Sequence, residues 1–315
     1  MQGLRFIPSG TRIPFTRFRM AGIVISSILI VASLFLFFTV NLNYGIDFRG
    51  GTLIEIRTKD GPADLGDLRS RLGGIGLGDV QIQEFGDPSE VLIRIEQQTG
   101  GEQNQQRSIQ LVKETLGDAV DYRRVEVVGP TVSGELIRDG TIAVVAAIFA
   151  VLLYIWFRFE WQFSIGAVAA LVHDVILTIG IFCLLQLEFN LSIIAAILTI
   201  VGYSLNDTVV VFDRIRENLR KFKKMELSDL VDLSLNETLS RTILTSVTTL
   251  LALGSLYIFG GQVIRGFTFA MIWGVVVGTY SSVFIASPVL MMLGVNRDRG
   301  GSPAPKLKEP ALRRT

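Results

Sequence analysis

The sequence is poor in the residues that usually build disulfides, metal sites and hydrolytic centres. Among 315 residues there is one cysteine, Cys183, and one histidine, His173. A single cysteine cannot form an internal disulfide, and a lone histidine without a surrounding cluster of cysteines or carboxylates is not a zinc-site pattern. No Gly-x-Ser-x-Gly or His-Glu-x-x-His motif is present, which argues against an intramembrane hydrolase. We therefore expect no enzyme activity, no metal and no cofactor.

Charged residues are scarce as well. Asp, Glu, Lys and Arg make up 19% of the chain against 49% hydrophobic residues, with 20 Phe and a mean hydropathy of +0.47. Such a composition indicates a chain that folds in lipid. Crossing a hydrocarbon core of about 30 Å takes roughly 20 helical residues. Apolar runs of that length predict an all-α membrane bundle of six transmembrane helices near residues 20–40, 139–157, 163–185, 191–212, 243–260 and 267–292.

Lys and Arg gather on one side of these spans. Basic residues precede the first span, recur between Arg214 and Arg241 and end the chain, whereas the opposite short loops contain only Arg265. Because basic loops stay in the cytoplasm, we expect both termini there, together with segment 1–19 and the loop 213–241. The first span is too long for a cleaved signal, and no small-residue cleavage pattern follows it.

The cytoplasmic segments differ in character. In the basic loop, apolar residues at helical spacing predict an amphipathic helix at the membrane interface: Leu227, Leu230, Val231, Leu235 and Leu239. The tail 293–315 is rich in Gly, Pro and charge, which predicts disorder.

Segment 41–136 is predicted to lie outside as one compact domain. Residue alternation, helical spacing and turn signals predict strands and helices in the order βαββαβ. This order is the ferredoxin-like α+β pattern, with both helices on one face of the sheet. It hosts many functions and identifies none. The predicted strands are 52–58, 80–85, 91–96 and 120–128, and the predicted helices are 63–72 and 104–116.

An aspartate interrupts the fourth span. Asp207 lies on the order of 8 Å inside the cytoplasmic boundary, where an ionisable group is a functional hypothesis by default. Arg241 lies at a similar depth where the chain re-enters the membrane, and it begins a polar helical face with Thr245, Thr248 and Thr249. We expect this face to meet Asp207. Such a pair suits proton loading and release; a static ion pair that fixes helix packing is the alternative.

Two other spans contain features of note. His173 and Asp174 lie mid-way along the third span; because successive helical residues point about 100° apart, the two are not expected to face the same neighbour. One is a candidate proton relay and the other a packing residue. In the sixth span, Gly274 and Gly278 begin a stripe of small residues at every fourth position, which predicts close helix packing within this chain or with another.

Two longer motifs resemble a known family. The first, Tyr44-Gly45-Ile46-Asp47-Phe48-Arg49-Gly50-Gly51-Thr52, follows the first span, and the second runs from Gly202 to Asn218 around Asp207. Shorter matches at 128–136, 172–174 and 234–242 extend the likeness over nearly the whole chain. The second motif is highly specific. Together they closely resemble the SecF family (SecD/SecF), a branch of the resistance-nodulation-division (RND) superfamily.

The resemblance implies a place in the Sec pathway of protein transport. Similar proteins reside in the bacterial cell inner membrane and work with SecD, the SecYEG channel and YajC. They use the protonmotive force to assist translocation of a preprotein. The resemblance also implies that Asp207 is the proton-linked carboxylate, with Arg241 and Thr245 as neighbours, and that SecD supplies the second half of a twelve-span core. A proton-driven efflux half-transporter for small molecules or lipids is the alternative, although the outer domain is single and small.

The first motif has a physical interpretation too. Gly45, Gly50 and Gly51, with Asp47 among them, lie where the chain leaves a helix and starts a strand. Glycine there permits positive φ or close backbone approach. We predict a tight structural junction that can act as a hinge between the membrane helices and the outer domain; contact with substrate is the alternative.

Overall fold

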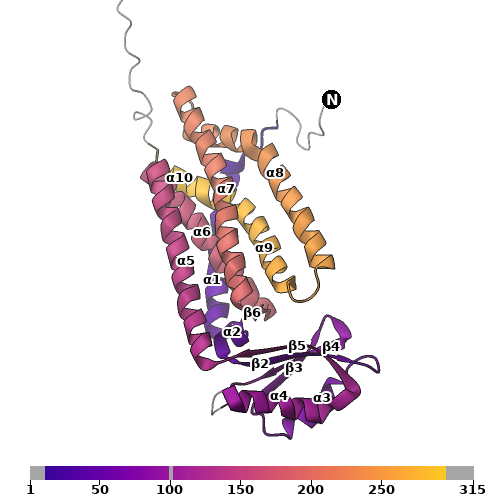
Figure 1. Cartoon of the computed structure of the whole chain (residues 1–315). Coiled ribbons are helices and arrows are strands. Elements are labelled where there is room, and N and C mark those ends of the chain that lie inside the picture. The colour runs from indigo at the N-terminus through magenta and orange to yellow at the C-terminus, as the bar shows by residue number, and fades with distance from the viewer. Residues whose placement is uncertain (1–10, 99–101, 296–315) are drawn as a thin grey trace, which may run out of the picture.

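The computed structural model describes residues 11–98 and 102–295. Six of its helices are long and apolar enough to cross a membrane, which agrees with the six predicted spans. A small α/β domain lies at one end of the helical bundle (Figure 1). The predicted disordered tail lies, from residue 296 onward, outside the described residues.

The bundle consists mainly of long helices. A short 3₁₀ helix precedes the first of them, and a π-helical turn follows the last. About half of each of the α6, α7 and α9 spans is buried (50%, 44% and 56%), against 11% for α1, α5 and α8. The first three therefore form the centre of the bundle. The elements are η1 (Phe15–Phe18), α1 (Arg19–Thr39), α5 (Pro130–Arg158), α6 (Trp161–Leu185), α7 (Leu191–Lys221), α8 (Leu227–Phe259), α9 (Arg265–Ser281), the π-helical η3 (Ser282–Ala286) and α10 (Ser287–Leu293).

Helices α7 and α8 extend well beyond the predicted spans. Only residues 222–226 connect them, so the segment predicted as a cytoplasmic loop, 213–241, consists mainly of two helix ends. The apolar stripe predicted to lie on a membrane surface is buried in the bundle core instead: Leu230, Val231 and Leu235 are 0%, 0% and 3% exposed. An amphipathic face can be covered by protein as well as by lipid, and the sequence pattern is the same in both cases.

The α/β domain is built on one antiparallel sheet. Its strand order is β3-β4-β2-β5, and Ile54 in β2 pairs with Ile93 in β4 and Val125 in β5. Two of the strands, β3 and β5, have the predicted bounds. The elements are β2 (Gly51–Thr58), α3 (Leu65–Gly73), β3 (Val80–Phe85), β4 (Asp87–Ile95), α4 (Glu102–Leu116), η2 (Gly117–Ala119) and β5 (Val120–Val128).

The two faces of this sheet have different partners. Helices α3 and α4 cover the face away from the bundle (Figure 1), where Ile54, Ile93 and Leu72 form a core. The other face points to the bundle and packs Leu53 and Leu92 against Ile46 of the short helix α2 (Ile46–Arg49). Strand β1 (Asn43–Tyr44) pairs in parallel with β6 (Glu188–Phe189), the connection between α6 and α7. The sheet is thus held next to the end of the bundle at which α7 begins (Figure 1).

Candidate functional site

Asp207 lies inside the bundle at the contact of α7 with α8. It is 6% exposed, and the Thr242 hydroxyl of α8 donates a hydrogen bond to its Oδ1 at 2.9 Å. Its other oxygen, Oδ2, is buried and accepts no hydrogen bond of ordinary geometry among the described residues, although the Ser282 hydroxyl of η3 lies close enough to act on the carboxylate. A buried acceptor without a donor is costly. Protonation of this oxygen removes the charge and supplies a donor, so the site is suited to bind and release a proton.

Arg241 and Thr245 form no hydrogen bond or ion pair with Asp207 among the described residues, although the charge of Arg241 is near enough to act on the carboxylate. Arg241 is exposed, and in the part of the chain that the structure describes its guanidinium has no carboxylate within 4.0 Å. The Thr245 hydroxyl donates to the backbone carbonyls of Arg241 at 3.1 Å and Thr242 at 2.9 Å. The face of α8 that meets Asp207 is therefore one residue out of phase with the predicted face.

The inward face of α8 had a signal in the sequence. Its buried residues Leu235, Thr238, Thr242 and Ser246 recur at spacings of three and four, which is one helical stripe. The prediction phased the helix on its charged residue, Arg241. Hydroxyl side chains that continue an apolar stripe were the better guide, because they can enter the bundle without the cost of burying a charge.

A second buried carboxylate lies deeper in the bundle. Asp174 and His173 are each 1% exposed, and His173 Nδ1 lies 2.9 Å from Asp174 Oδ1. The hydroxyls of Ser204 on α7 and Ser281 on α9 donate to Asp174 Oδ2 at 2.6 and 2.8 Å. His173 and Asp174 thus contact each other and both contact α9, so the expectation that they do not face the same neighbour is wrong. Successive side chains do leave a helix about 100° apart, but the imidazole turns back far enough to meet the carboxylate.

This cluster extends to the first helix. The His173 ring stacks on Tyr280 with centroids 6.0 Å apart. The Tyr280 hydroxyl donates to the Gly22 carbonyl of α1 at 3.0 Å and lies 3.1 Å from the Ser26 hydroxyl. The chain of polar contacts therefore links α1, α6, α7 and α9. Since Ser204 precedes Asp207 by three residues on α7, the two buried carboxylates lie within about one helical turn of a shared element.

Gly274 and Gly278 of α9 pack against α7, within this chain. A Cβ atom on Gly274 would lie 2.3 Å from Ile200 Cγ1, and one on Gly278 would lie 3.0 Å from Ser204 Cβ. Their small size therefore brings α9 close to Asp207. Immediately after this contact, α9 changes into the π-helical turn η3, a feature that often marks functional sites.

The glycines of the first motif form a tight junction. Gly51 has φ +119°, and a Cβ there would lie 2.4 Å from the Ile95 carbonyl oxygen, while Gly50 has φ +71°. A Cβ on Gly45 would lie 2.7 Å from Glu188 Oε1. Asp47 Oδ2 accepts a hydrogen bond from the Leu191 backbone nitrogen at 2.8 Å, which caps the first turn of α7 from outside the helix.

An ion pair that the sequence reasoning missed lies beside this junction. Arg94 of β4 is 8% exposed and lies 2.9 Å from Glu188 Oε2 in the α6–α7 connection. Its Nη1 donates to Asn43 Oδ1 at 3.4 Å and Gln81 Oε1 at 3.3 Å. Burial raises the pKa of Glu188, and the charge of Arg94 opposes part of that rise. A single arginine within the apolar run Val91–Ile95 was the available signal.

Family models match most of the chain. The model described as protein export membrane protein SecD/SecF, C-terminal, matches residues 108–296, and the SecD/SecF GG motif matches residues 35–61. The chain is 50% identical over 308 residues to the protein translocase subunit SecF of Cereibacter sphaeroides, covering 95% of this chain and 94% of that one. It is 46% identical to the SecF subunit of Rickettsia rickettsii, covering 93% and 96%.

Solved structures agree. The crystal structure of SecDF from Thermus thermophilus, a translocon-associated membrane protein, superposes with a TM-score of 0.82 at 34% identity. A second structure, SecDF in a super-membrane-facing form, superposes with a TM-score of 0.64 at 33% identity. The matches cover 90% and 92% of this chain but only 39% of each SecDF chain. On these grounds the chain belongs to the SecD/SecF family of protein-export membrane proteins, as a SecF-type translocase subunit.

Proposed function

We propose that this chain works with SecD to use the protonmotive force for preprotein translocation across the bacterial inner membrane, with Asp207 as the group that takes up and releases the proton. The observation that carries the proposal is the unpaired Oδ2 of Asp207 inside an apolar bundle. An ionisable group in such a place is expensive and is retained for function. The chain acts as a transport subunit and not as an enzyme.

Arg241 and Thr245 are proposed to act on Asp207 in a second conformation of the bundle. They flank Thr242 on α8, one residue before and three residues after the side chain that holds Asp207. A rotation of α8 about its axis exchanges Thr242 for Arg241 opposite the carboxylate. Because a nearby guanidinium favours the ionised carboxylate, this conformation would be the one that releases the proton.

His173 and Asp174 form the next polar site to which a proton could pass from Asp207. Asp174 is held by hydroxyls of α7 and α9, so a shift of either helix alters its surroundings. The Nε2 atom of His173 is buried without a hydrogen-bond partner in the described residues. This leaves one position on the imidazole at which a proton can be accepted or passed on.

The α/β domain is proposed to be ferredoxin-like and periplasmic, with both termini of the chain in the cytoplasm. The strand order β3-β4-β2-β5, with two helices on one face, supports the fold. The orientation is supported by the concentration of Lys and Arg at the end of the bundle opposite to this domain.

The junction of Gly45, Asp47, Gly50 and Gly51 is proposed to pass motion from the bundle to this domain. Asp47 is bonded to the first residue of α7, the helix that carries Asp207. One charge crossing 100 mV releases about 2.3 kcal/mol, enough to change a two-state population nearly fiftyfold at about 1.4 kcal/mol per factor of ten. The available energy therefore suffices to bias such a hinge.

SecD is proposed as the direct partner, with SecYEG and YajC as further members of the assembly. The chain spans 39% of the SecDF chains that it matches, so a complementary half is expected. The faces of α1, α5 and α8, which are largely exposed, are available to SecD and to membrane lipid.

The experiment is preprotein export into inverted membrane vesicles with an imposed protonmotive force. Asp207→Asn is expected to assemble with SecD but to lose the stimulation of export by the protonmotive force. Asp213→Asn is the matched control, because Asp213 lies on the same helix but pairs with Arg158 at the exposed end of the bundle. Normal stimulation in the Asp207→Asn vesicles would disprove the proposed role.

A further inference from the structure

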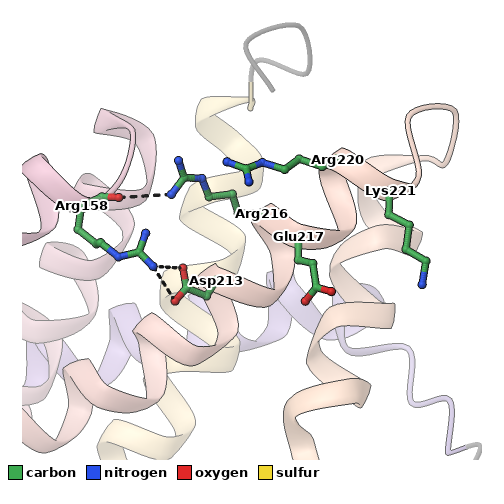
Figure 2. Close-up of a pocket in the computed structure, with 6 residues that line it drawn as sticks. All are labelled: Arg158, Asp213, Arg216, Glu217, Arg220 and Lys221. Carbon is green, nitrogen blue, oxygen red and sulfur yellow. Dashed lines mark hydrogen bonds and ion pairs between the residues drawn. The ribbon is translucent and has the colours of Figure 1, made fainter. Parts of the chain in front are cut away.

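Basic residues gather in a pocket where α5 and α7 end, far from Asp207. Figure 2 shows Arg158 at the end of α5 beside Asp213 and Arg216 of α7, with Arg220 extending toward Arg216 and with Glu217 and Lys221 turned away. Arg158 pairs with Asp213 through contacts of 2.9 and 3.1 Å. Arg216 Nη1 donates to the Arg158 backbone carbonyl at 3.4 Å. These contacts hold the two helix ends together and fix the floor of the pocket. Its lining residues are Arg158, Asp213, Arg216, Glu217, Arg220 and Lys221.

The acidic residues of the pocket do not balance its cations. Asp213 is taken up by Arg158, and Glu217 pairs with Arg214 at 2.6 Å outside the pocket. Within the described ranges, Arg216 and Arg220 have no carboxylate within 4.0 Å. A helix C-terminus attracts cations to its last turn, but Arg216 lies before the last turn of α7, which ends at Lys221. The helix dipole therefore accounts for Arg220 and Lys221 in the last turn but not for Arg216, whose charge is available to an anionic ligand.

Exposed aromatic residues place this pocket at the level of the lipid headgroups. Tyr154 lies one turn before Arg158 on the same face of α5 and is 59% exposed, and Phe157 is 87% exposed. Exposed tyrosines gather at the boundary between hydrocarbon and headgroups, so Tyr154 marks this level, and Phe157 adds apolar surface beside it. A ligand that reaches the arginines from the bilayer would therefore have its acyl chains beside Tyr154 and its charged group beside Arg216 and Arg220.

We propose that this pocket binds the headgroup phosphate of an anionic phospholipid. Arg216 and Arg220 are four residues apart on one face of α7 and can hold the phosphate from two sides, since guanidinium groups bind phosphate oxygens in a bidentate manner. Arg158 closes the pocket from α5. The lipid bridges the two helix ends and adds to the single ion pair between Arg158 and Asp213.

Native mass spectrometry of the full-length chain tests the proposal. The purified protein is mixed with equal amounts of phosphatidylglycerol and phosphatidylcholine of different mass. We expect phosphatidylglycerol to be retained preferentially. Arg216→Gln with Arg220→Gln should weaken its binding by at least about tenfold, because each basic residue near an anionic surface strengthens binding by roughly fivefold. Arg17→Gln with Arg19→Gln removes the same charge at the same end of the bundle and should leave binding unchanged.

Two further measurements test whether the pocket recognises the lipid headgroup: a lysine variant and a soluble phosphate competitor. Arg216→Lys with Arg220→Lys keeps the charge but not the bidentate contacts, so it should lose less binding than the glutamine variant; this separates a loss of charge from a folding defect. Soluble glycerol 3-phosphate should not displace the lipid. Four outcomes would each overturn the proposal. Two concern specificity: equal retention of both lipids, or displacement of the lipid by glycerol 3-phosphate. Two concern the variants: an equal loss of lipid binding in the Arg17 and Arg19 control, or a loss in the lysine variant as large as in the glutamine variant.

Discussion

Arg94 and Glu188 join the α/β domain to the membrane bundle through an ion pair of 2.9 Å. Arg94 comes from β4 in the middle of the sheet, and Glu188 from the connection between α6 and α7. The side chains are 9% and 23% exposed. Removing one partner of a pair this well shielded lowers the stability more than breaking a surface pair does, because the remaining charge stays partly buried.

Arg94→Ala is therefore expected to loosen the domain from the bundle. Breaking a buried ion pair costs about 3–5 kcal/mol, and the partial exposure of Glu188 reduces this to roughly 2 kcal/mol. Hydrogen exchange should rise at residues 43–51 and 186–191. Arg123→Ala is the control, since Arg123 is 49% exposed and pairs at 3.7 Å within the domain. Equal exchange in both variants would contradict a docking role.

Glu188 should make this docking depend on pH. Burial raises its pKa above the ordinary value of 4.5, with Arg94 acting in the opposite direction. Between 4.5 and the raised value the folded state binds more protons than the unfolded state, so stability falls as pH rises through that window. Thermal unfolding of the wild type between pH 4.5 and pH 8 should show this slope, and Glu188→Gln should reduce it. An unchanged slope in the variant would assign the pH dependence to other groups.

Gly51→Ala should disrupt the start of the sheet. The residue has φ +119°, and a Cβ would approach the Ile95 carbonyl oxygen, a backbone atom that cannot turn aside, to 2.4 Å. We expect a loss of roughly 1–3 kcal/mol, as for other strained backbone positions. Gly61→Ala is the matched control, because its φ is +105° with no atom within 4 Å. If thermal unfolding shows the same loss for both, positive φ alone is the cause and the close approach is irrelevant.

Gly274→Ala should separate α9 from α7. The new methyl group would meet three side-chain carbons of Ile200 within 2.7 Å, and overpacking of this kind costs about 1–3 kcal/mol. Adding Ile200→Ala should restore much of the stability by making room. Gly254→Ala in α8 has no neighbour within 4 Å and should not destabilise. Failure of the Ile200 change to rescue would show that the clash is not the cause of the loss.

Thr242→Val should impair proton-driven export. It keeps the side-chain shape but removes the hydrogen bond of 2.9 Å to Asp207, the one well-formed hydrogen bond that the carboxylate accepts in the described structure. We expect export in the presence of the protonmotive force to fall about tenfold, which corresponds to the roughly 1.4 kcal/mol of one hydrogen bond to a charged group. Thr248→Val is the control, since its hydroxyl bonds only to backbone carbonyls of α8. Equal export in the two variants would argue against a role for the Thr242 hydrogen bond in proton-driven export.

Much of the fold was predictable because it follows local patterns. Long apolar runs indicated the six spans, and alternation gave β3 and β5 their bounds. Asp207 stood out as a charge in an apolar helix. These features depend on residues close together in the sequence, for which helical and strand periodicity is a direct guide.

The contacts between segments could not be predicted in the same way. Which face of α8 meets Asp207 depends on the rotation of that helix, and phasing the helix on Arg241, not on the stripe of hydroxyl residues that continues from Leu235, gave the wrong face. The Arg94 and Glu188 pair joins residues of two segments, and no local pattern links them. The burial of Leu230 and Leu235 depends on a neighbouring helix that the amphipathic pattern does not specify.

The cap that Asp47 places on α7 has a mechanical consequence. Sixteen residues separate Leu191, which receives the cap, from Asp207, and this corresponds to about 24 Å along one unbroken helix. A continuous helix is stiff along its axis, so under the proposed mechanism an axial displacement of α7 at Asp207 would reach Asp47 with nearly the same amplitude. The α/β domain would then be moved by the end of the same helix that carries the carboxylate, through the hydrogen bond between Leu191 and Asp47.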